Sequence, residues 1–128
     1  MSAKILAFAG STRSNSFNKR LVRAAAVMAE EAGATVTIVD LRDYPLPLYD
    51  GDLEQAEGLP EHAATLYELF KSHDALLISS PEYNSSVSAV LKNTIDWVSR
   101  PRDGEQPLEA FSGKVAGLLC ANSPFLPC

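Results

Sequence analysis

Short apolar runs alternate with helical segments along this chain, and that alternation restricts the folds open to it. The strand candidates are apolar or β-branched runs at 4–9, 35–39, 75–78 and 114–120. The segments between them place apolar residues at helical spacing, over about 15–32, 60–70 and 87–98. Such alternation predicts an α/β fold, a parallel sheet with helices on both faces. The length of 128 residues suits one domain, 1–128.

Each expected helix carries one apolar stripe that should face the sheet. The stripes are Leu21, Ala25, Met28 and Ala32 in the first helix, Ala63, Leu66, Tyr67 and Phe70 in the second, and Val87, Leu91, Ile95 and Val98 in the third. Residues 44–58 are rich in proline, glycine and acids and are expected to form a connection. Trp97 lies off the third stripe, either at the edge of the core or in a subunit contact.

Ligands of open parallel sheets bind at the carboxyl ends of strands, where the strand order reverses. In the strand order 2-1-3-4-5, one of the common arrangements of such sheets, that point lies between the first and third strands. The loops that follow these two strands, 10–18 and 79–86, are also the two most unusual segments of the chain. The candidate site residues therefore come from these loops.

The first loop, Gly-Ser-Thr-Arg-Ser-Asn-Ser-Phe-Asn, joins a strand to a helix N-terminus. Its hydroxyls and backbone N–H groups can surround a phosphate, and the helix dipole favours an anion there. Arg13 can add a charge-assisted pair. Lys19 and Arg20 are cations near a helix N-terminus, where the helix dipole disfavours positive charge. A bound anion would explain why they are there. The alternative is an ordinary serine-rich loop with a helix cap. Neither the Rossmann nor the P-loop glycine pattern is present.

The second loop, Ser-Ser-Pro-Glu-Tyr-Asn-Ser-Ser, follows the third strand. Pro81 stiffens the chain there, and the next residues can present backbone N–H groups to a planar polar ring. Tyr83 could cover an aromatic face, and Asn84 can both donate and accept. The alternative is a turn in which Asn84 or Ser85 caps the third helix.

The charge distribution narrows the class of ligand. A net charge of −5 argues against general nucleic-acid binding. Between Ser11 and Arg23 there are nevertheless four cations and no acid, which suits a small anion, although chance clustering on a helix face is an alternative. No run approaches the roughly 20 apolar residues of a membrane span. No secretion signal is evident, and Cys120 and Cys128 do not make a metal site. We expect a cytoplasmic protein without metal.

Three segments, at 10–21, 80–84 and 91–101, carry a family resemblance. They read GSTRSNSFNKRL, SPEYN and LKNTIDWVSRP, in this order. Together they resemble the NADPH-dependent FMN reductases, a family that includes quinone, chromate and azo-dye reductases. The resemblance implies a flavodoxin-like three-layer sandwich with a parallel sheet in the order 2-1-3-4. It also implies FMN as cofactor, NADPH or NADH as co-substrate, and a quinone, flavin or other small molecule as electron acceptor.

The resemblance also assigns residues to the two ends of the flavin. Ser11, Arg13, Ser16 and Asn18 would hold the FMN phosphate, beside Gly10 and Phe17. Ser80, Pro81, Glu82, Tyr83 and Asn84 would line the isoalloxazine ring. The flavin carries the redox chemistry, so no catalytic acid or base is named. The helix around 86–99 would form the contact of a homo-oligomer, a dimer or tetramer.

The sequence departs from the family pattern after the fourth strand. Residues 121–128 contain two prolines and no glycine, where the family has a glycine-containing loop, a fifth strand and further helices. The expectation is an incomplete domain whose fourth strand is an exposed edge. The leading functional hypothesis is an FMN-dependent NAD(P)H reductase. Its alternatives are a flavodoxin-like electron carrier and a truncated, non-catalytic remnant.

Overall fold

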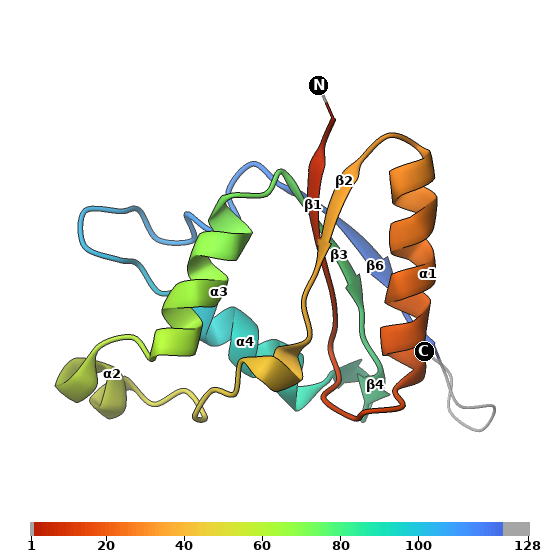
Figure 1. Ribbon diagram of the computed structural model, residues 1–128. Coiled ribbons are helices and arrows are strands. Elements are labelled where there is room, and N and C mark those ends of the chain that lie inside the picture. Colours follow the sequence, from red (N-terminus) through yellow and green to blue (C-terminus); the bar gives the residue numbers. More distant parts are fainter. Residues whose placement is uncertain (1, 122–128) are drawn as a thin grey trace.

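A four-stranded parallel sheet forms the centre of the molecule (Figure 1). The computed structural model describes residues 2–121. Its main strands are β1 (Lys4–Ala9), β2 (Thr35–Ile38), β3 (Ala75–Ser79) and β6 (Val115–Leu119). Their order is β2-β1-β3-β6, which confirms the predicted 2-1-3-4 arrangement. Ala9 pairs with Ser79 and Ser79 with Leu119, so β1, β3 and β6 end together at one edge.

Helices cover both faces of this sheet and complete the predicted three-layer sandwich. The helix α1 (Phe17–Glu31) packs on one face, and α3 (Glu61–Lys71) and α4 (Ala89–Val98) lie on the other (Figure 1). Between β2 and α3 the chain adds a short 3-10 turn, η1 (Leu41–Asp43), and the helix α2 (Gly51–Glu57). That helix falls inside the predicted connection 44–58, where it exposes most of its surface and has no apolar stripe to reveal it.

The strands bury side chains on both faces because they alternate between two cores. Leu6, Phe8, Leu76 and Ile78 join Leu66, Phe70 and Leu91 in the larger core, beneath α3 and α4. Ala7 and Ala9 face the other way and contact Val22 of α1. The small alanines allow α1 to lie close to the sheet. The stripe predicted for α3 is buried throughout, as expected.

The stripe predicted for α1 is wrong. The helix buries Asn18, Lys19, Val22 and Ala26, whereas Met28 is 70% exposed. The buried face is displaced around the helix because two polar residues occupy it in the first turn. Apolar periodicity cannot identify polar side chains that are buried through hydrogen bonds.

The segment before α4 forms a small hairpin instead of the start of a helix. Its strands are β4 (Glu82–Tyr83) and β5 (Ser86–Val87). Asn84 and Ser85 between them have φ values of 53° and 64°, the left-handed pair that two-residue hairpin turns require. Val87, predicted for the helical stripe, therefore lies in a strand and is exposed. The side chain of Ser88, not of Asn84 or Ser85, caps α4.

Trp97 is buried within the described fold. Its side chain therefore does not form the subunit contact that was one of its two expected positions. Its side chain is fully buried, and its Nε1 donates to the Pro47 carbonyl at 2.7 Å. The ring of Tyr49 meets it edge-on, with centroids 4.9 Å apart. The irregular segment after η1 folds back over α4 and covers the tryptophan. The apolar periodicity of α4 does not show which other segment covers the helix, so it could not place Trp97.

The strand β6 forms one edge of the described sheet, as predicted. Val115 and Leu118 point to opposite faces of the sheet and are each 74% exposed, so β6 is open on both faces within residues 2–121. No described helix has both the length and the apolar character that crossing a membrane requires.

Candidate functional site

The loops after β1 and β3 meet at the carboxyl edge of the sheet. Gly10 donates its N–H to the Ser79 carbonyl at 2.8 Å and accepts from Ser88 Oγ at 2.5 Å. A Cβ atom added to Gly10 would lie 2.5 Å from Ser80 Oγ. Only glycine fits between the two loops without displacement. The structure therefore brings the two sequence-predicted segments together at the predicted point of the sheet.

The first loop turns directly into the N-terminus of α1. Ser16 caps this helix, and its Oγ accepts from the backbone N–H groups of Asn18 and Lys19. Ser11 is buried, and its Oγ accepts from the Arg13 N–H at 3.3 Å. The Arg13 carbonyl accepts from the Ser16 N–H at 3.2 Å, which closes the loop into a compact turn. Hydroxyls and backbone dipoles are thereby gathered at the positive end of α1.

Cationic and aromatic side chains form the outer surface of this loop. Phe17 is 57% exposed, and the guanidinium groups of Arg13 and Arg20 lie 5.9 and 6.0 Å from its ring centroid. Arg13 also donates to the Asn15 carbonyl at 3.1 Å. Within residues 2–121 no carboxylate pairs with Arg13. Its charge is therefore available to an anion.

Asn18 connects the ends of three elements instead of facing only the loop. Its Oδ1 accepts from Ser79 Oγ at 2.7 Å and from the Ala121 N–H at 2.9 Å. Its Nδ2 donates to the Ala121 carbonyl at 3.2 Å. These bonds use the carbonyl oxygen and one amide hydrogen. Within the described residues 2–121, the second Nδ2 hydrogen is the side-chain group of Asn18 that is left for a ligand.

A charged network missed by the sequence reasoning lies next to the loop. Lys19 is 6% exposed, and its Nζ pairs with Asp40 Oδ2 at 2.9 Å. That partner accounts for Lys19 near a helix N-terminus without an anion, so Lys19 no longer supports phosphate binding. Burial alone would raise the pKa of Asp40. The hydrogen bonds from the Arg42 N–H and Lys19, with the charges of Lys19 and Arg23, lower it instead. The sequence signal for this network was Asp40, an acidic residue shortly after β2 that could pair with a cation next to the first loop.

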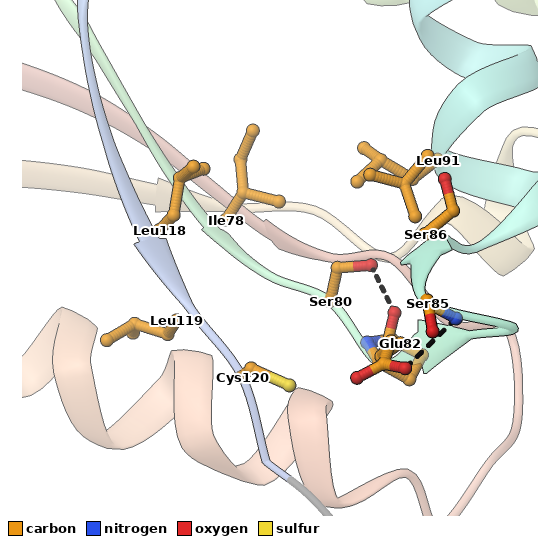
Figure 2. A pocket seen from close by; sticks show the side chains of 11 residues that line it. Ile78, Ser80, Glu82, Ser85, Ser86, Leu91, Leu118, Leu119 and Cys120 are labelled. Atoms are coloured by element: carbon orange, nitrogen blue, oxygen red, sulfur yellow. Dashed lines mark hydrogen bonds between the residues drawn. The ribbon is translucent and has the colours of Figure 1, made fainter. Parts of the chain in front are cut away.

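A pocket of about 590 Å³ opens beside the second loop (Figure 2). It is lined by Ile78, Ser80, Pro81, Glu82, Ser85, Ser86, Val87, Leu91, Leu118, Leu119 and Cys120. Ile78 and Leu118 are register partners on β3 and β6 and provide part of its apolar wall. Glu82 Oε1 accepts from the Ser85 N–H at 3.0 Å, a bond within the hairpin that lies at the pocket rim (Figure 2).

The structure divides the predicted ring-binding residues into two groups. Ser80, Pro81 and Glu82 line the pocket. Tyr83 and Asn84 lie at the exposed end of the hairpin, outside that lining. The arrangement offers anion donors at α1 and, at the end of β3, an apolar recess large enough for an aromatic ring. These two chemistries suit the phosphate and ring of FMN. Among residues 2–121, no cluster of His, Cys, Asp or Glu could hold a metal ion.

Comparison with known proteins gives one consistent family. A family model described as NADPH-dependent FMN reductase matches residues 3–124. An NAD(P)H-dependent FMN reductase of Pseudomonas aeruginosa is 38% identical over 94% of this chain and 60% of its own length. A quinone reductase of Escherichia coli is 40% identical over 82% of this chain and 54% of its own length. The chain thus spans little more than half of these curated relatives.

Solved structures share the fold of the described chain. FerB from Paracoccus denitrificans, a flavoenzyme NAD(P)H:(acceptor) oxidoreductase, superposes with a TM-score of 0.73 and 30% identity. The match covers 92% of this chain and 60% of that one. A putative quinone reductase from Klebsiella pneumoniae gives a TM-score of 0.69 at 22% identity, over 93% of this chain and 59% of that one, a likeness of fold alone.

Proposed function

This chain belongs to the NADPH-dependent FMN reductase family, and on that premise we propose that it binds FMN and acts as an NAD(P)H-dependent oxidoreductase. The proposed electron donor is NADPH or NADH, and the proposed acceptor is a quinone, a flavin or a similar small molecule. Bound FMN would supply the redox chemistry, accepting a hydride from the nicotinamide and delivering electrons to the acceptor. The protein's part is to bind and orient the reactants.

The phosphate end is assigned to the first loop. Ser11, Arg13 and Ser16 would hold the phosphate, together with the backbone of Gly10 and Phe17 and the second Nδ2 hydrogen of Asn18. The N-terminus of α1 adds its dipole to the charge of Arg13. Arg13 supplies a guanidinium that no described carboxylate neutralises.

The ring end is assigned to the second loop. Ser80, Pro81 and Glu82 line the 590 Å³ pocket, and its apolar wall would exclude water from one side of a flat ring. Tyr83 and Asn84 are proposed to approach the ring from the hairpin end. Tyr83 ends β4 and Asn84 begins the turn of the same hairpin, whose first residue Glu82 lines the pocket.

The observation that carries the proposal is the contact between Gly10 and Ser80. This contact places two loops side by side at the ends of β1 and β3. One loop carries Arg13, which forms no ion pair with a described carboxylate, and the other borders the apolar pocket. A phosphate-bearing aromatic cofactor requires this combination of surroundings.

An absorbance spectrum tests the proposal directly. FMN is added to the purified chain, excess is removed by gel filtration, and the retained flavin spectrum is recorded. We expect a yellow protein that bleaches on anaerobic addition of NADPH and recovers its colour with a quinone. Retained flavin without bleaching would favour a flavin-binding electron carrier. A colourless protein would favour a non-catalytic remnant.

A matched variant separates specific binding from adsorption of flavin. Arg13→Ala removes an exposed side chain, so the fold should be unaffected. We expect it to weaken FMN about tenfold, through loss of a charge-assisted contact. Arg102→Ala is the control, because Arg102 pairs with Glu68, away from both loops. Equal losses in both variants would contradict the assignment of Arg13 to the phosphate.

Self-association and location complete the proposal. We propose a homo-oligomer, a dimer or tetramer, that uses the exposed side of α4 or the edge strand β6, where Val115 and Leu118 are exposed. Sedimentation velocity over a range of concentrations tests this, and a monomer at every concentration would contradict it. We also propose a cytoplasmic location, which cell fractionation tests.

A further inference from the structure

We propose that Lys19, Asp40 and Arg42 form a positioning network that sets the shape of the phosphate loop, residues 11–16, before a ligand binds. None of the three is among the proposed FMN ligands. The inference rests on the proposed function, since it concerns the affinity of that loop for the phosphate. It assigns a role to residues on α1 and on η1 and its N-cap that the binding loops themselves do not explain.

The network acts on the carbonyl of Thr12. That oxygen accepts from Lys19 Nζ at 3.3 Å and from a guanidinium nitrogen of Arg42 at 3.1 Å. Two cationic side chains from different elements thus converge on one backbone atom. Asp40 places both of them: its Oδ2 pairs with Lys19 at 2.9 Å and its Oδ1 accepts the Arg42 backbone N–H at 3.0 Å.

The peptide between Thr12 and Arg13 is held from both sides. In a trans peptide the carbonyl and the following N–H lie in one plane and point in opposite directions. The carbonyl faces Lys19 and Arg42, and the N–H donates to Ser11 Oγ at 3.3 Å. Rotation of this peptide would break all of these bonds together. The same Arg42 nitrogen donates to Ser14 Oγ at 3.2 Å, which extends the restraint along the loop.

A packing role alone does not account for the choice of residues. Lys19 occupies the buried face of α1, where the following positions of that face, Val22 and Ala26, are apolar. A buried ammonium is costly unless it is paired and hydrogen-bonded. An apolar side chain would pack there at lower cost, but it could not restrain the Thr12 carbonyl. Donors held in place before binding lose less entropy when the ligand arrives.

Arg42→Ala is the informative variant because Arg42 is exposed and its loss should leave the fold intact. The dissociation constants of the purified chain for FMN and for riboflavin, which lacks the phosphate, are measured by flavin fluorescence. Loss of two hydrogen bonds predicts FMN binding about three- to tenfold weaker, and riboflavin binding changed by less than about twofold. Arg102→Ala is the matched control and should change neither constant.

Salt separates positioning from simple attraction between Arg42 and the phosphate. At about 0.5 M salt, exposed charges are screened over a few ångströms. The ratio of the FMN dissociation constants of variant and parent should persist at that salt if Arg42 shapes the loop. A ratio that falls to one, an unchanged FMN constant, or equal losses for FMN and riboflavin would each overturn the proposal.

Hydrogen exchange keeps the outcome independent of the proposed function. If the parent chain binds no FMN, that result contradicts the proposed function but does not decide whether the network exists. Amide exchange of residues 12–16 in the parent and in Arg42→Ala then decides whether the network shapes the loop. Faster exchange in the variant supports the network, and identical exchange overturns it.

Discussion

Gly10 and Ser80 are in such close contact that the hydrogen atom serving as the glycine side chain is the only one that fits between them. A Cβ at position 10 would meet Ser80 Oγ at 2.5 Å, Ser80 Cβ at 2.9 Å and Leu91 Cβ at 3.2 Å. The contact joins β1, β3 and α4 at the candidate site. The backbone conformation at Gly10 is ordinary, so the requirement for glycine there is one of space.

Gly10→Ala should therefore both destabilise the fold and disturb the site. Overpacking of this kind costs about 1 to 3 kcal/mol. Urea denaturation measures the loss. Gly51→Ala is the control, because a Cβ there meets nothing closer than Tyr49 at 3.9 Å, and its stability should be unchanged. Adding Ser80→Gly to Gly10→Ala should restore part of the stability. A full additive loss in the double variant would argue against the steric cause.

The hydrogen bond between Asn18 and Ser79 predicts a strong coupling. Ser79 is fully buried, and Asn18→Ala would leave its hydroxyl and the Ala121 N–H without their acceptor. We expect a loss of about 2 to 3 kcal/mol from unsatisfied buried groups. Asn18→Ala combined with Ser79→Ala should lose less than the sum of the two single changes. Strict additivity in this double-mutant cycle would contradict the bond as a stabilising contact.

The ion pair of Lys19 and Asp40 makes stability depend on pH at the acidic end. The pKa of Asp40 is lowered in the folded state. The stabilisation that ionised Asp40 adds to the free energy of unfolding is therefore complete above the pKa of the unfolded chain, about 3.9. It is lost as the pH falls through the lower pKa of the folded state. The expected size is up to about 1 kcal/mol for a partly exposed pair.

Unfolding free energies of the parent and of Asp40→Asn between pH 2 and pH 7 test this directly, over roughly the range in which carboxylates titrate. The difference between the two proteins should be constant near neutrality and shrink toward the acidic end. Asp103→Asn, which alters an exposed carboxylate, is the control. A difference that grows on acidification would contradict a lowered pKa of Asp40 in the folded state.

Trp97 is the single tryptophan and provides a direct test of its buried position. Its emission should be blue-shifted in the folded chain, and dilution should not change it. Trp97→Ala should cost about 3 to 5 kcal/mol, as for other large core aromatics. Trp97→Phe should cost less, because Asn93 Nδ2 still donates to the Pro47 carbonyl at 2.9 Å. Emission that shifts on dilution would instead place Trp97 at a subunit contact.

The sheet could be predicted because its strands are apolar runs with distinct boundaries. The runs at 4–9 and 75–78 became β1 and β3 almost unchanged, and the site followed from the ends of those strands. The resemblance supplied the strand order, which local patterns do not contain. The predicted residues of both loops then lay at the same edge of the sheet.

The errors share one physical cause, which is that short-range patterns do not include polar burial or irregular chain. Asn18 and Lys19 are buried through partners at positions 79, 121 and 40, so they displaced the apolar stripe of α1. The hairpin before α4 depends on two left-handed residues, neither of them glycine, so a strong turn signal was missing. Trp97 is covered by an irregular segment that begins some fifty residues earlier, near Pro47.

The bonds between Asn18 and Ala121 join positions 103 residues apart, and this separation determines when the site can be completed. The loop after β1 is synthesised early, yet its Asn18 amide finds two of its partners only after β6 has joined β3. Closing so long a loop is entropically slow compared with forming α1. The contacts of Asn18 at the start of α1 are therefore complete only when β6 is in place, so this corner of the candidate site depends on assembly of the sheet through β6.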